Sequence, residues 1–204
     1  IGRICQLVDG LPLGIRLAAG WMEMLTPAEI ADQIARGLDF LETERHDVPA
    51  RQQSMRAVFD HSWTLLTQRE RSVMQTLSVF RGGFTAEAAR AVSGASLREL
   101  MTLVNRSLLH RNPGERYEVH ELLRQYAAQE LAGSVDGAGA VRDRHCSYFC
   151  AALEGWGTDL WCERQDTAMA ALRADRENAR AAWDWAVERG YVEQLDKAVF
   201  GLSY

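Results

Sequence analysis

Residues 96–123 read SLRELMTLVNRSLLHRNPGERYEVHELL, and this stretch decides the expected fold. Ser96 followed by Glu99 is a capping box, and apolar residues then recur at the spacing of one helix face. Two short, partly alternating runs flank the turn at Asn112–Gly114, which is typical of a β-hairpin. Helical periodicity resumes at Glu121. The stretch therefore predicts a helix, a small hairpin and a second helix.

Upstream residues extend this pattern. Thr26–Glu29 and Thr67–Glu70 repeat the capping box, and Thr85 begins a shorter helix without one. Residues 51–132 then read helix, helix, short helix, helix, hairpin, helix. Three helices closing on a two-stranded wing are the winged-helix arrangement, here with an extra helix at each end. The expected fold is mainly α, with a helical part before the winged helix.

The residues after the hairpin predict a linker and an array of helices. AGSVDGAGA at 132–140 is rich in small residues and glycine, as a linker is. Amphipathic helices are expected at 141–156, 163–174, 176–189 and 191–203, and they resemble stacked TPR-like repeats. Their aromatic residues could line a partner groove, although a role in the core is favoured: Trp156, Trp161, Trp183, Trp185, Tyr191. The expected domains are 1–50, 51–133, the linker 134–140, and 141–204.

Composition describes an ordinary soluble globular chain. It has 204 residues, of which 47% are hydrophobic and 25% charged. The longest runs without a charged residue have nine members, Ser72–Phe80 and His145–Leu153, too few to span a bilayer. No signal peptide is visible at the start, so a cytoplasmic location without membrane contact is expected. We expect the chain to be a piece of a longer protein.

Charge and cysteine content limit the functional classes. The net charge is −5, yet residues 51–117 carry +5 between acidic flanks. That basic middle indicates either a nucleic-acid surface or, with more weight, a face that docks an acidic neighbouring domain. The cysteines lack the spacing of a zinc site, so reduced thiols and no metal are expected: Cys5, Cys146, Cys150, Cys162. No arrangement of nucleophile and base is found, and no catalytic residue is predicted.

Five segments in order resemble the NB-ARC or STAND class of regulatory ATPases. Gly10–Leu13 matches the GLPL motif, and Val119–Ala127 is similar to the MHD motif, with Val for Met and Glu for Asp. Leu77–Thr85, Leu103–Leu109 and Glu177–Ala186 are similar to the winged-helix opening, the helix-to-strand passage and the following helices of bacterial transcriptional regulators in that class. Together these segments span nearly the whole chain.

This resemblance implies a larger parent protein. Its nucleotide-binding domain would precede Ile1 and its helical sensor would follow Tyr204, and both would be partners of this fragment. ADP or ATP with Mg would bind to the parent, with no cofactor expected in the fragment itself. The fragment has no phosphate-loop motif, so it is not expected to be an enzyme, although the parent would be an ATPase. A homo-oligomer is expected for the activated parent.

Two residues carry the cofactor role that the resemblance implies. Pro12 would pack on the adenine, or would simply begin a helix, where its missing N–H costs nothing. His120 would reach the β-phosphate of ADP, or would be a partly buried histidine whose ring nitrogens are hydrogen-bonded within the protein. In either role His120 is expected to be neutral, because a cation is disfavoured at a helix N-terminus. The favoured function is thus a nucleotide-switched regulatory fragment in which the winged helix senses ADP or ATP.

The alternative function is a winged-helix DNA-binding module with a helical dimerisation tail. The helix Ser96–Arg106 would then be the recognition helix, with Arg98 and Arg106 reaching bases or phosphates. Arg111 and Arg116 on the wing could reach the DNA backbone. The resemblance places DNA binding in a separate domain and does not favour it for this fragment.

Overall fold

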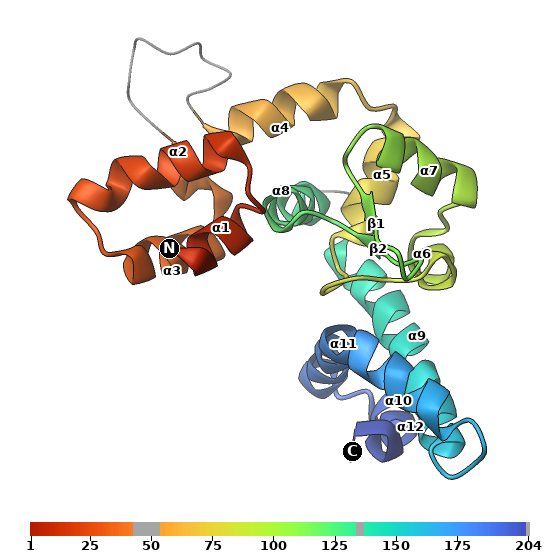
Figure 1. The fold of residues 1–204 in the computed structure, drawn as a ribbon. Coiled ribbons are helices and arrows are strands. Elements are labelled where there is room, and N and C mark those ends of the chain that lie inside the picture. The colour runs from red at the N-terminus through yellow and green to blue at the C-terminus, as the bar shows by residue number, and fades with distance from the viewer. Residues whose placement is uncertain (43–53, 134–136, 203–204) are drawn as a thin grey trace.

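The computed structural model describes residues 1–42, 54–133 and 137–202. It is mainly helical, with a single two-stranded antiparallel sheet in the described residues, which confirms the predicted helical class. Figure 1 shows α8 between the first helices and the hairpin. The last helices extend away from both of these parts.

The first part is a small helical unit. Its elements are α1 (Gly2–Leu7), α2 (Pro12–Gly20), η1 (Trp21–Glu23), α3 (Pro27–Arg36) and η2 (Leu38–Phe40). Pro12 is the first residue of α2, where its fixed φ favours the helix. The capping box predicted at Thr26 is formed with Glu29. α1 packs against α3, and Ile30 and Ile34 are fully buried.

The middle part carries the hairpin. It comprises α4 (Met55–Thr64), α5 (Gln68–Leu77), α6 (Ala86–Ser93), α7 (Leu97–Asn105), β1 (His110–Arg111), β2 (Tyr117–Glu118) and α8 (Glu121–Ala132). The predicted capping boxes at Thr67 and Ser96 are both formed, and the Thr85 hydroxyl caps α6. The strands pair with Arg111 opposite Tyr117. The hairpin is confirmed, although each strand has only two residues.

Phe84 pairs with Tyr117 of β2 in an isolated antiparallel bridge. Its N–H donates to the Tyr117 carbonyl at 2.9 Å, and the Tyr117 N–H donates to the Phe84 carbonyl at 2.8 Å. The segment between α5 and α6 is thereby held against β2. Phe80 stacks on Phe84 with ring centroids 4.4 Å apart, so aromatic packing reinforces the pairing.

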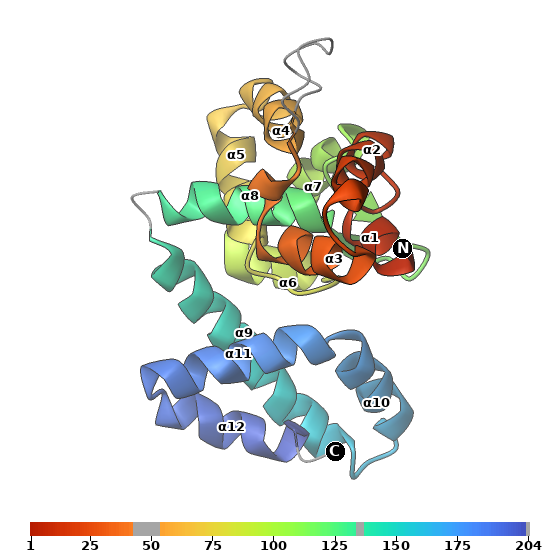
Figure 2. The same ribbon diagram turned by 90° about the vertical axis from the view of Figure 1, so that its left-hand side faces the viewer.

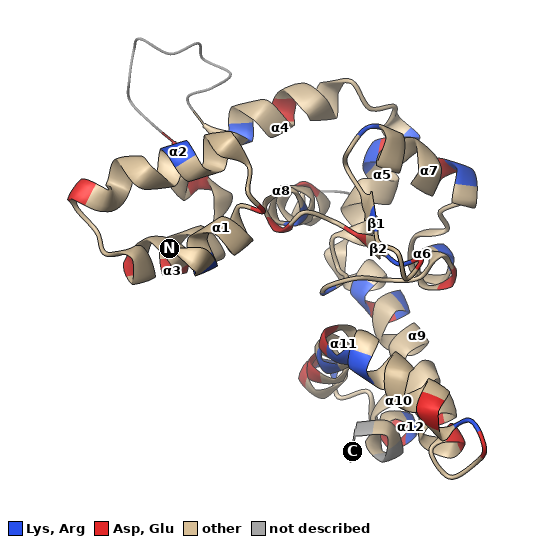
Figure 3. Ribbon diagram, viewed as in Figure 1, with Lys and Arg blue, Asp and Glu red and all other residues tan. Residues whose placement is uncertain are grey.

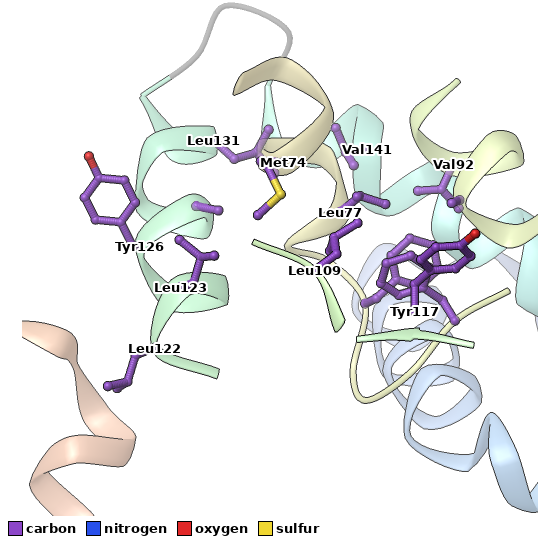
Figure 4. Packing of buried hydrophobic residues seen from close by; sticks show 14 of the residues in the cluster. Met74, Leu77, Val92, Leu109, Tyr117, Leu122, Leu123, Tyr126, Leu131 and Val141 are labelled. Carbon is purple, nitrogen blue, oxygen red and sulfur yellow. The ribbon is translucent and has the colours of Figure 1, made fainter. Parts of the chain in front are cut away.

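One hydrophobic cluster runs through the described residues. α5 packs against α8, and Met74, Leu77, Leu123 and Leu131 of these two helices lie in the cluster (Figure 4). Truncating a buried leucine to alanine typically costs about 2–5 kcal/mol, so this contact is a major part of the stability of the middle part.

The last part consists of four helices: α9 (Ala138–Asp159), α10 (Gln165–Ala174), α11 (Arg176–Arg189) and α12 (Val192–Leu202). They correspond to the predicted helices, with α9 longer at both ends. α9 contacts the other three helices and also α6 of the middle part. Figure 2 shows α9 leading from the middle part into the group formed with α10, α11 and α12.

Two boundary predictions fall partly outside the described residues. The proposed boundary near residue 50 and residues 134–136 of the linker belong to segments that the structure does not describe. Ala138 is already helical, so the linker does not reach residue 140.

The aromatic residues of these helices differ in exposure. Trp156, Trp183 and Trp185 are half-buried against the core, whereas Trp161 is 78% exposed and is not the core residue that was expected. Among the described helices, none has the length and apolar character needed to cross a membrane.

Candidate functional site

α6 and α7 are two consecutive helices joined by a short turn. Gly94, Ala95 and Ser96 join them, and Gly94 has φ of +66°, in the left-handed region that favours glycine. Arg69 of α5 holds this turn, because its guanidinium donates to the Gly94 carbonyl at 2.9 Å and to Glu99 at 2.7 Å. Hydrogen bonds from Arg69 and then Ser96 lower the pKa of Glu99 to about 2. The turn is therefore fixed by charge-assisted bonds.

α7 has one buried face and one open face. Leu100 and Leu103 are fully buried against the middle part. On the opposite side, Leu97 is 61% exposed and Met101 41% exposed, with Arg98 beside them. The side chain of Arg98 forms no ion pair within the described part of the chain. The outer face of α7 is thus a mixed apolar and basic surface.

The other predicted DNA-binding arginines have partners inside the protein. Arg111 lies 3.0 Å from Glu115 on the hairpin, in an exposed pair of the kind that contributes at most about 1 kcal/mol. Arg106 donates to the Leu65 carbonyl at 3.0 Å and lies 3.5 Å from Glu70. Arg98 and Arg111 are therefore available to a ligand, and Arg106 less so.

Arg116 is committed to a buried network. Its guanidinium lies 2.5 Å and 3.1 Å from the two carboxylate oxygens of Asp175, in a bidentate pair whose side chains are 16% and 8% exposed. It also donates to the Gly83 carbonyl at 2.6 Å. The expectation that Arg116 reaches a DNA backbone is not met by this geometry, because its Nη1 and Nη2 atoms already donate to Asp175 and Gly83.

Asn178 completes the network and was missed in the sequence. Its amide oxygen accepts from the Arg81 N–H at 2.7 Å, and its amide nitrogen donates to Gly83 at 2.9 Å and Asp175 at 3.0 Å. The partners lie far apart along the chain, and no local spacing signals such a contact. The network fixes α11 to the segment between α5 and α6.

Pro12 and His120 lie on the same cavity. Its volume is about 310 Å³, and it lies between the start of α2, α4, the end of α7 and the start of α8. Most of its wall is apolar, with Met55, Phe59 and Leu123 among the lining residues. The structure thus brings together the two residues that were predicted to share a site.

The hydrogen bonds of His120 define a neutral tautomer. The Leu122 N–H donates to its Nδ1 at 3.1 Å, so this nitrogen lacks a proton and caps α8. Nε2 is 3.1 Å from the Val8 carbonyl and must be the donor there. This agrees with the expected neutral imidazole and shows that His120 joins the first helical unit to α8. The neighbouring Glu121 pairs with Arg124 at 2.8 Å rather than with His120.

Charge is unevenly placed on the molecule. Figure 3 shows basic residues on α5 and α7 and near the hairpin, and both signs on the last four helices. Within the ranges that the structure describes, no group of three or more His, Cys, Asp or Glu residues could hold a metal ion. The cysteines are free thiols, and those of Cys146 and Cys150 lie 3.9 Å apart.

The chain is similar to mycobacterial proteins. It is 33% identical over 204 residues to the Mycobacterium tuberculosis protein named "Putative HTH-type transcriptional regulator Rv0890c". This alignment covers 95% of the chain and 23% of that protein. It is also 30% identical over 156 residues to "Uncharacterized protein Rv0894" of the same organism. That alignment covers 71% of the chain and 39% of the relative. The chain thus spans less than a quarter of the length of the first relative. No protein-family model matches it, and no solved structure matches it.

These similarities correct the resemblance drawn from the sequence. The relative that aligns with 95% of the chain is named a putative HTH-type transcriptional regulator, not an NB-ARC or STAND ATPase, so the assignment to that ATPase class is wrong. A nucleotide-driven switch has no support from them. Binding of ADP by Pro12 and His120 stays a prediction that neither the fold nor the relatives test.

Proposed function

We propose that the chain is part of a transcription regulator and presents a helix-turn-helix surface to duplex DNA. The single observation that carries the proposal is the α6–turn–α7 unit, which agrees with the HTH designation in the name of a relative that aligns with 95% of the chain. In helix-turn-helix proteins the second helix lies in the major groove and the first crosses the backbone. α7 is then the recognition helix.

The surroundings of this unit support a winged-helix assignment. The strand-like segment at Phe84 precedes α6, and the hairpin of β1 and β2 follows α7, so a small sheet flanks the two helices. The turn of the hairpin lies between Arg111 and Tyr117 and would form the wing. Arg98 on α7 and Arg111 on the wing are the two arginines proposed to contact DNA.

The last four helices are proposed to form TPR-like helical hairpins. α11 ends at Gly190, which has φ of +66°, and α12 begins at Val192, so the two helices are joined by a short turn. Ala179, Ala182 and Ala186 form a buried stripe of small residues on α11 that permits close helix packing. A dimerisation role for this tail stays a prediction.

DNA binding is tested by fluorescence anisotropy with a labelled random-sequence duplex at several salt concentrations. The protein is expected to bind with an affinity that falls steeply with salt, because each phosphate contact releases counterions. Changing Arg98 and Arg111 together to Ala is expected to weaken binding and to reduce the slope of log affinity against log salt by about 2.

The matched control is Arg36→Ala, which removes an exposed arginine at the end of α3 in the first helical unit. This variant should bind DNA like the unmodified protein. Equal affinity and salt slope in the double variant and the unmodified protein would show that the surface of α7 does not meet DNA. Circular dichroism of each variant checks that the helices are intact.

A further inference from the structure

A second cavity lies between the middle part and the last four helices. Its volume is about 320 Å³. One wall comes from the residues that follow α5 and from α8, and the other from α9 and α11. Arg81, Arg124 and Arg142 all line it, so three guanidinium groups from three separate segments meet at one cavity.

These arginines are incompletely neutralised. Among these three arginines, the described residues give an ion pair only to Arg124, with Glu121 at 2.8 Å. Arg124 also donates to the Ser78 carbonyl at 3.2 Å. Arg142 lies over the Trp185 ring at 5.0 Å, and within the described residues neither it nor Arg81 forms a salt bridge. Partial desolvation and then the charge of Arg124 lower the pKa of Arg81 below its usual value. Arg81 and Arg142 therefore bring guanidinium N–H donors to the cavity that no ion pair within the described residues uses.

The wall formed by α9 and α11 carries two carboxylates in addition to Arg142. Asp184 and Glu188 of α11 line the cavity, and neither forms an ion pair with any described residue. The arginines and these carboxylates share one cavity without closing into salt bridges, so they are separated by more than the 4.0 Å that such a contact allows. A ligand in this space would meet guanidinium donors on both walls and carboxylate acceptors on the wall formed by α9 and α11.

We propose that this cavity binds a small phosphate monoester that carries hydroxyl groups, with Arg81, Arg124 and Arg142 on the phosphate and Asp184 and Glu188 on the hydroxyls. Arginine matches phosphate oxygens through paired N–H donors. Three guanidinium groups therefore suit a ligand with a dianionic phosphate better than a ligand with a single carboxylate. Two of the arginines are exposed to solvent, so the phosphate can enter without unfolding.

The bound ligand would join two parts of the molecule. Arg81 and Arg124 belong to the middle part, whereas Arg142 and both carboxylates belong to α9 and α11. A ligand that binds only when these walls face each other stabilises that arrangement by its binding free energy. The site is therefore suited to a small-molecule effector, and its existence is independent of DNA binding by α7.

Isothermal titration calorimetry with glucose 6-phosphate, inorganic phosphate and glucose tests the proposal. Glucose 6-phosphate is expected to bind saturably, inorganic phosphate more weakly, and glucose not at all. Changing Arg81 and Arg142 together to Gln should weaken glucose 6-phosphate binding by at least about tenfold, since two charge-assisted contacts are lost. Arg180→Gln, which removes an exposed arginine of α11 outside the cavity, should leave binding unchanged.

The two carboxylates of the cavity, Asp184 and Glu188, are tested separately. Changing Asp184 and Glu188 together to Ala should reduce the preference for glucose 6-phosphate over inorganic phosphate. The proposal is overturned if neither phosphate compound binds at millimolar concentration, or if the Arg81 and Arg142 double variant binds as tightly as the unmodified protein. Thermal denaturation of each variant without ligand separates loss of the site from loss of the fold.

Discussion

Replacing Asp175 with Ala is expected to destabilise the protein strongly. Asp175 is the carboxylate partner of Arg116, and the pair joins the hairpin to the start of α11. Its removal would leave the guanidinium, which is 16% exposed, without a counter-charge in a largely dry site. Because the desolvation of the arginine remains and the attraction is gone, the loss is much larger than the net contribution of the pair.

The magnitude follows from the contacts that survive. Breaking a buried ion pair by removing one partner typically costs about 3–5 kcal/mol. Arg116 would keep its bonds to the carbonyls of Gly83 and Ala174, so the low end of that range, about 3 kcal/mol, is expected. For a chain of this length the loss corresponds to a fall in Tm of about 6–12 °C.

Differential scanning calorimetry and urea unfolding measure the effect. The control is Glu177→Ala, since Glu177 pairs with Arg176 at 3.0 Å in an exposed contact that contributes at most about 1 kcal/mol. Changing Arg116 and Asp175 together to Leu should recover part of the lost stability, because no unpaired charge then remains. If Asp175→Ala cost no more than Glu177→Ala, the pair would not be the buried connection described above.

Three further predictions concern other sites. Burial, opposed by the hydrogen bond to Asn178, lowers the pKa of His145 to about 4, so the unfolded chain gains a proton below pH 6.5 before the folded chain does. Stability should fall by up to about 3 kcal/mol from pH 7 to pH 4, and urea unfolding of His145→Phe should lack this part of the slope. Ser96→Ala removes the cap of α7 and should cost about 1 kcal/mol in thermal unfolding. His120→Ala loses the cap of α8 and the bond to Val8, about 1–2 kcal/mol in the same assay, whereas His120→Asn should cost less because Asn also caps helices.

Much of the fold was predictable because its signals are local. A capping box needs only a hydroxyl and a carboxylate three residues apart, and those at Thr26, Thr67 and Ser96 all formed. The hairpin at 110–118 was similarly marked by its turn residues. Propensity and capping act within one or two turns of chain, so they can be read before the tertiary contacts are known.

The candidate sites were less predictable because they depend on non-local contacts. Arg116 was assigned to DNA from its place on the hairpin, yet Asp175, 59 residues away, binds it. Arg81 and Arg142 reach one cavity only because α9 packs beside the middle part. The ATPase assignment was wrong because short motifs that match a class in order do not establish membership when the aligned relatives carry another designation.

The side-chain amide of Asn178 forms hydrogen bonds with the backbone between α5 and α6 that a neighbouring β-strand would usually form. Its oxygen and nitrogen satisfy the Arg81 N–H and the Gly83 carbonyl in the same way as the backbone of a neighbouring strand would. A rotation of α11 therefore cannot occur without pulling on the backbone that leads directly into Phe84 and α6. The backbone that enters α6 is thus held by a side chain 95 residues further along the chain.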